Sequence, residues 1–137
     1  MRSLIMALPL NILASCTMFM RVPPETAFAR TRVSESGRYR ATIKPDGDSI
    51  PRGKLQSWTL HVETTDGAPV DSVAITIGGG MPQHGHGLPT KPQVTRYLGH
   101  GDYLVEGMKF NMGGWWVVKF RVGTASGQDE VVFNLKV

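Results

Sequence analysis

Two histidines separated by a single glycine, His84 and His86, are the residues of this chain whose type and spacing could do chemistry. In extended backbone the side chains at positions i and i+2 lie on the same side, so both imidazoles can face one point. They belong to residues 78–92, a stretch rich in glycine and proline that is incompatible with a helix or a central strand. We therefore expect an ordered loop, and we look for function there.

Methionines lie near the histidines in the sequence. Met81 comes three residues before His84, and Met112 lies in a second glycine-containing segment, 106–114, just ahead of a tryptophan-rich strand. Imidazole and the soft, uncharged thioether together suit copper, and Cu(I) in particular. If the two loops meet at one end of the fold, His84, His86, Met81 and Met112 form a four-ligand set.

A structural explanation of the same residues stays open. The histidine rings can simply be solvated, or they can donate hydrogen bonds to loop carbonyls and order the loop. Methionines commonly fill hydrophobic cores, and for Met108 packing is the favoured role. His61 is expected on a polar strand face and His100 at an exposed hairpin tip.

The chain offers little support for catalysis or nucleic-acid binding. No serine lies in a nucleophile-elbow motif, and the glycines at 78–80 lack the lysine and helix of a phosphate-binding loop. The formal charge of +4 comes from 15 basic and 11 acidic residues that are scattered without a basic run. We expect a binding module and not an enzyme.

The elements that must position these residues are strands. Segments of alternating apolar and polar residues are separated by turn signals, and no helical period is present after the N-terminal segment; the segments are 38–44, 55–63, 73–77, 94–98, 103–106, 115–122 and 131–137. This pattern predicts an all-β, seven-stranded antiparallel immunoglobulin-like sandwich over residues 37–137. Trp58 and Trp116 are its expected core anchors, and 29–36 is interpreted as a tether.

Residues 1–29 are interpreted as a signal segment and tether. A positive start precedes an apolar stretch of 17 residues, 4–20, which is marginal for spanning a bilayer. Two processing sites compete: cleavage after Ala29, or a lipobox at 13–16 that would leave Cys16 lipidated. Cys16 is the only cysteine, so the domain has no disulfide, which favours a bacterial envelope protein.

The motifs resemble those of a known family. Gly79-Gly80-Met81-Pro82 running into His84-Gly85-His86-Gly87-Leu88-Pro89-Thr90, with Gly107, Phe110 and Met112-Gly113 ahead of the tryptophan strand, is similar to the YtkA-like/FixH-like domains of bacterial envelope proteins. Ser57-Trp58-Thr59-Leu60 and the turn Asp66-Gly67-Ala68-Pro69-Val70 look like that family too. The resemblance extends over about residues 37–137.

The resemblance implies an immunoglobulin-like domain in the periplasm or cell envelope, often anchored by lipid or membrane. Some relatives are associated with copper handling or the assembly of copper-containing oxidases, so an envelope membrane protein or a copper carrier is the expected partner. Family members often have proline after the second-loop methionine, where this chain has Gly113, so a metal role transfers less securely to Met112 than to the histidines. The alternative is a structural accessory domain of an envelope membrane complex that binds no metal.

Overall fold

A computed structural model describes residues 20–125 and 127–137, so the apolar segment and the lipobox with Cys16 lie outside the described residues. Within the described chain there is one short 3-10 helix followed by nine strands: η1 (Glu25–Phe28), β1 (Thr31–Val33), β2 (Tyr39–Pro45), β3 (Gln56–Thr64), β4 (Ala74–Met81), β5 (His86–Gly87), β6 (Gln93–Gly99), β7 (Asp102–Met108), β8 (Trp115–Thr124) and β9 (Gly127–Lys136). No helix in the described part of the chain is long and apolar enough to cross a membrane.

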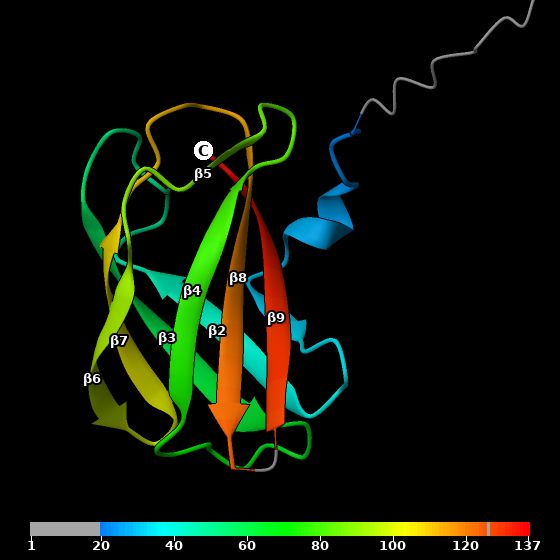
Figure 1. Cartoon of the computed structure of the whole chain (residues 1–137), viewed down its shortest axis with the longest axis vertical. Helices are drawn as coiled ribbons and strands as arrows, with labels where there is room; N and C mark the ends of the chain where they lie inside the picture. The colour runs from blue at the N-terminus through cyan, green and yellow to red at the C-terminus, as the bar shows by residue number, and fades with distance from the viewer. Residues whose placement is uncertain (1–19, 126) are drawn as a thin grey trace, which may run out of the picture.

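The strands form two sheets that pack face to face (Figure 1). One sheet has the order β1-β2-β3-β7-β6, the other has the order β5-β4-β8-β9, and every pairing is antiparallel. Alternation along each strand explains this arrangement: in β2, for example, Tyr39, Ala41 and Ile43 are buried while the residues between them are not. The predicted all-β sandwich is confirmed.

Aromatic side chains fill the core between the sheets. Trp58 of β3 and Trp116 of β8 are 1% and 0% exposed, which confirms both as core anchors. Phe110 lies between them, with ring centroids 5.8 Å from Trp58 and 5.2 Å from Trp116. Met108 is fully buried in the same cluster, as a packing residue would be.

Three features differ from the sequence-based expectation. The segment interpreted as a tether contains β1, whose Arg32 is aligned with Ala41 of β2. The expected loop at 78–92 contributes its first four residues to β4 and two more to β5. With β1 and β5 added, the described chain has nine strands instead of the seven expected. Residues 79 and 80 can extend β4 because they are glycines: a Cβ at Gly79 would lie 2.1 Å from the Val117 carbonyl oxygen, and one at Gly80 would lie 2.2 Å from the His86 carbonyl oxygen.

The loops at one end of the sandwich are tied together, and we call this end the histidine end; its loops are 46–55, 82–92 and 109–114. The backbone N–H of Gly53 donates to the Phe110 carbonyl at 2.7 Å, and the Thr90 hydroxyl donates to the Gly107 carbonyl at 2.6 Å. The last residue joins them, because Gly114 and Val137 exchange two backbone hydrogen bonds of 2.9 and 3.1 Å. These contacts make the histidine end one connected surface.

The N-terminal segment also reaches the histidine end. Gln83 donates a side-chain hydrogen bond to the Met20 carbonyl at 3.2 Å. Further along, the Asn134 amide of β9 donates to the Ala27 carbonyl at 3.1 Å, and the Lys136 ammonium lies 5.1 Å from the centre of the Phe28 ring. Residues 20–28 are therefore packed along β9 and up to the loop that bears the histidines (Figure 1).

The opposite end carries loops 34–38, 65–73 and 100–101. Its buried charged group is Asp129, which is 6% exposed. Burial raises the pKa of this carboxyl, but hydrogen bonds from Ser34, from Ser36 and from the backbone N–H of Glu130 outweigh that effect and hold the pKa well below its usual range. The charged carboxylate thus fixes loop 34–38 onto β9.

Candidate functional site

His84 and His86 lie side by side on an exposed turn at the histidine end. Their ring centroids are 5.9 Å apart and the ring planes are inclined by 27°. The turn is closed by the Met81 carbonyl, which accepts hydrogen bonds from the backbone N–H groups of His84 at 3.1 Å and Gly85 at 3.0 Å. Gly85 has φ of +66°, a conformation that glycine adopts without strain. Both imidazoles are thus close together and open to solvent.

The histidine turn folds back over the end of β4 because of a glycine there. Gly80 is aligned with Gly87 and Met81 with His86 in the short β4–β5 pairing. A Cβ at Gly80 would lie 2.2 Å from the His86 carbonyl oxygen, far inside contact distance. A larger residue at Gly80 would therefore push β5 away and move His86 with it.

Trp116 connects the histidine turn to the second methionine loop. The His86 ring packs near the Trp116 ring at a centroid distance of 5.9 Å and an inclination of 69°. The Trp116 indole N–H donates to the Met112 carbonyl at 3.0 Å. The sequence indicated Trp116 only as a core residue, yet it also contacts the site.

The two methionine loops meet, as the four-ligand hypothesis requires, but the two methionines differ. Met81 is 2% exposed, and its terminal methyl would lie 3.1 Å from a Cβ placed on Gly114. Met112 is 37% exposed. Met81 is thus packed as a core side chain beneath the loop, whereas Met112 is partly exposed to solvent.

The donor groups near the histidine pair limit the metals that could bind there. Among the described residues, no group of three or more His, Cys, Asp or Glu side chains is placed to hold a metal ion. A metal bound by both imidazoles must therefore complete its coordination with thioether sulfur, backbone carbonyl or water. Structural zinc sites usually need four His, Cys or carboxylate ligands, whereas Cu(I) accepts thioethers. Two imidazoles joined by a thioether would be a donor set of the kind that Cu(I) accepts.

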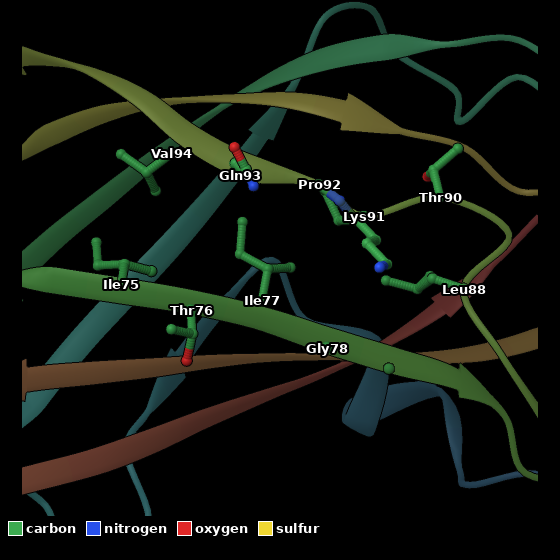
Figure 2. Close-up of a pocket in the computed structure, with 11 residues that line it drawn as sticks. Ile75, Thr76, Ile77, Gly78, Leu88, Thr90, Lys91, Pro92, Gln93 and Val94 are labelled. Carbon is green, nitrogen blue, oxygen red and sulfur yellow. The ribbon is translucent and has the colours of Figure 1, made fainter.

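A separate groove of about 570 Å³ lies between the edge strands β4 and β6 of the two sheets (Figure 2). Ile75 and Ile77 of β4 line one side, and Val94 of β6 lines the other. Lys91 supplies a charged group at the margin. The groove contains neither histidine nor methionine, so it is distinct from the candidate metal site.

The other histidines lie away from this site. His61, on the outer face of β3, has its Nδ1 atom 2.7 Å from a carboxylate oxygen of Asp102 and its Nε2 atom 3.4 Å from Glu63. The Arg40 guanidinium, hydrogen-bonded to Glu63 at 2.9 Å, holds the pKa of that carboxyl below its usual value. The contact between His61 and Asp102 was not predicted, because the register of β3 against β7 cannot be deduced from the sequence of either strand alone.

These features define a class: a small all-β domain of two packed antiparallel sheets that presents a histidine pair on an end loop. The YtkA-like family model matches residues 38–121, more than half of the chain, and the chain belongs to that family. The match runs from the start of β2 into β8 and so includes both methionine loops. The FixH-like part of the resemblance stays an expectation.

Among solved structures, the ZirS C-terminal domain is similar to this chain with a TM-score of 0.42 and 16% sequence identity. That similarity covers 100% of this chain and 88% of the other. No curated protein sequence matches the chain.

Proposed function

We propose that this protein is an exported, non-enzymatic domain of the periplasm or cell envelope that binds Cu(I) at His84 and His86 and passes it to a membrane protein or copper carrier. The observation that carries the proposal is the pairing of two exposed imidazoles, 5.9 Å apart, on a glycine turn. That turn lies against the tryptophan and the second methionine loop.

The exposure of the ligands suits exchange more than storage. Both imidazoles face solvent, so an incoming donor group from a partner can reach the metal without the fold opening. Met112, already exposed, is the thioether available to complete the coordination. Met81 closes the turn through its backbone carbonyl and would join the coordination only by turning its side chain out of the core.

The proposal is tested by a Cu(I) competition titration of the purified protein and of a variant with His84→Ala and His86→Ala. The matched control carries His61→Gln and His100→Asn, which removes two histidines away from the site; asparagine tolerates the φ of +54° at residue 100. We expect tight one-to-one binding that the first variant loses and the control keeps. Trp116 fluorescence supplies an independent signal, because the indole lies beside His86.

Absence of Cu(I) binding, or equal binding by all three proteins, would contradict the copper function. The second candidate would then be favoured: an accessory domain of an envelope membrane complex without a metal. Its supporting observation is the groove of Figure 2, which is next to the edge of β4. Between Ala74 and Ile77 this edge has no strand partner among the described residues, so an extended segment of a partner can add to the sheet there.

A further inference from the structure

We propose that the histidine end of the sandwich docks on a bilayer surface that contains anionic lipid, with loops 46–55 and 109–114 in contact with the headgroups. The docked orientation can be tested without copper, although Met112 belongs to one of the docked loops. Three observations carry it: the charge of this end, its exposed apolar side chains, and the place where the N-terminal segment leaves the domain.

The two ends of the sandwich carry opposite charge. The loops of the histidine end and residues 20–24 contain five basic and two acidic residues, a net charge of +3: Arg21, Arg52, Lys54, Lys91 and Lys109 against Asp46 and Asp48. The loops of the opposite end contain one basic and three acidic residues, a net charge of −2: Arg38 against Glu35, Asp66 and Asp71. An anionic surface therefore attracts the first end and repels the second.

Large apolar side chains are exposed among these cations. Leu55 is 68% exposed beside Lys54, Met20 is 61% exposed beside Arg21, and Met112 is 37% exposed in the loop that starts with Lys109. Apolar side chains flanked by lysine and arginine are typical of segments that insert shallowly at a membrane interface. An acidic protein partner would satisfy the cations but gives no separate reason for isolated apolar tips in three segments.

The N-terminal segment brings this end to the membrane. The Gln83–Met20 hydrogen bond places residue 20 next to the histidine turn. Cys16 lies only four residues earlier, so a lipid on Cys16 would be attached within about 14 Å of Met20, at roughly 3.5 Å per extended residue. An apolar segment kept as an anchor would impose the same restriction.

This geometry requires that residues 20–29 stay in the mature protein, and their packing supports retention. Asn134 bonds the Ala27 carbonyl and Lys136 covers the Phe28 ring, so β9 has side chains that fit the segment. Cleavage after Ala29 would discard these contacts. We therefore assign processing before residue 20, or retention of the whole segment.

The test uses the full chain isolated from bacterial membranes. Its intact mass identifies the processing site, and hydrogen–deuterium exchange is then measured in vesicles of phosphatidylcholine alone and with one-quarter phosphatidylglycerol. We expect the amides of 46–55 and 109–114 to exchange several-fold more slowly only when phosphatidylglycerol is present. The amides of 65–73 and 100–101 should exchange equally in both.

Two charge-reversal variants separate specific docking from general attraction. Arg52→Glu with Lys54→Glu should abolish the protection, since each basic residue contributes on the order of fivefold to binding an anionic surface. Arg96→Glu with Lys119→Glu, at exposed positions within β6 and β8, changes the net charge by the same amount. This second variant should keep the protection from exchange.

A mature chain that starts at Arg30 would overturn the proposal. Equal protection of both ends from exchange would also overturn it, as would protection that does not depend on phosphatidylglycerol. Equal loss of protection in the two charge-reversal variants would have the same meaning. No protection in either vesicle would remove lipid as the occupant and point to an acidic protein surface.

Discussion

Replacing Gly80 by alanine tests the geometry of the site without changing any candidate ligand. The added Cβ would lie 2.2 Å from the His86 carbonyl oxygen and 2.9 Å from the Gly87 Cα, both backbone atoms that cannot rotate away. Normal contact requires about 3.4 Å. The histidine turn must therefore move by about 1 Å, or β4 must bend away from it.

The magnitude follows from the cost of overpacking. Forced backbone shifts of this kind cost about 1–3 kcal/mol. Alanine also restricts the unfolded chain, which offsets about 0.4–1 kcal/mol of that cost. We expect Gly80→Ala to lower the free energy of unfolding by about 1–2 kcal/mol and to weaken Cu(I) binding by displacing His86 from Trp116.

Gly78→Ala is the matched control, two residues away in the same strand. A Cβ at Gly78 meets no atom within 4 Å, and neither Gly78 nor Gly80 has a left-handed φ. This substitution should leave stability unchanged or raise it slightly, with Cu(I) affinity intact. Urea denaturation followed by tryptophan fluorescence measures the stability, and the Cu(I) competition titration measures the site.

Equal stability and equal Cu(I) binding of the Gly80→Ala and Gly78→Ala variants would contradict the expected clash at Gly80. That result would mean that the histidine turn does not fold back over β4. Loss of stability with unchanged Cu(I) affinity would instead confirm the fold and separate the metal site from the β4–β5 pairing.

Three further predictions concern other parts of the domain. Asp129→Asn should destabilise the protein by about 2 kcal/mol at neutral pH; because the folded-state pKa is depressed, the difference from the native protein should shrink as pH falls below about 4, measured by urea denaturation across pH. Met81→Ala should cost about 2–5 kcal/mol because the side chain is buried, whereas Met112→Ala should change the free energy of unfolding by less than about 0.5 kcal/mol. The Tyr97 pKa is raised by its hydrogen bond to Asp71, so Asp71→Asn should let the Tyr97 phenol ionise at lower pH in a spectrophotometric titration.

The sequence predicted the sandwich because each strand carries its own signal. A period of two along β3 places Trp58, Leu60 and Val62 on one face, and all three are buried in the structure. The β8 pattern does the same for Trp116. Such alternation is local information that needs no knowledge of the partner strand.

The glycine-rich stretch was less predictable because it is organised by contacts between distant residues. Gly79 and Gly80 were interpreted as loop residues, but they extend β4 where the backbones of Val117 and His86 approach too closely for any side chain. No pattern within residues 78–80 distinguishes this role from a flexible turn. The close approach of these backbone segments, which are distant in the sequence or reached by a turn, determines that glycine is required at 79 and 80.

The proximity of His84 and His86 could be predicted from their spacing, whereas the residues that surround them could not. The contact of His86 with Trp116 depends on β4 being paired with β8, a relation between segments about 40 residues apart. The burial of Met81 and the exposure of Met112 likewise depend on how the loops fold. The resemblance had made Met112 the less secure of the proposed ligands, yet Met112 is the methionine with the more exposed side chain.

The pairing of Val137 with Gly114 has a practical consequence for handling this protein. Both backbone groups of Val137 are engaged with the loop that carries Met112, so any residues fused after position 137 must leave the domain beside the candidate metal site. A polyhistidine tag placed there would offer competing imidazoles within reach of the metal and distort measured affinities. Purification by a tag that contains no metal ligands, or by one that is cleaved off completely, avoids this artefact.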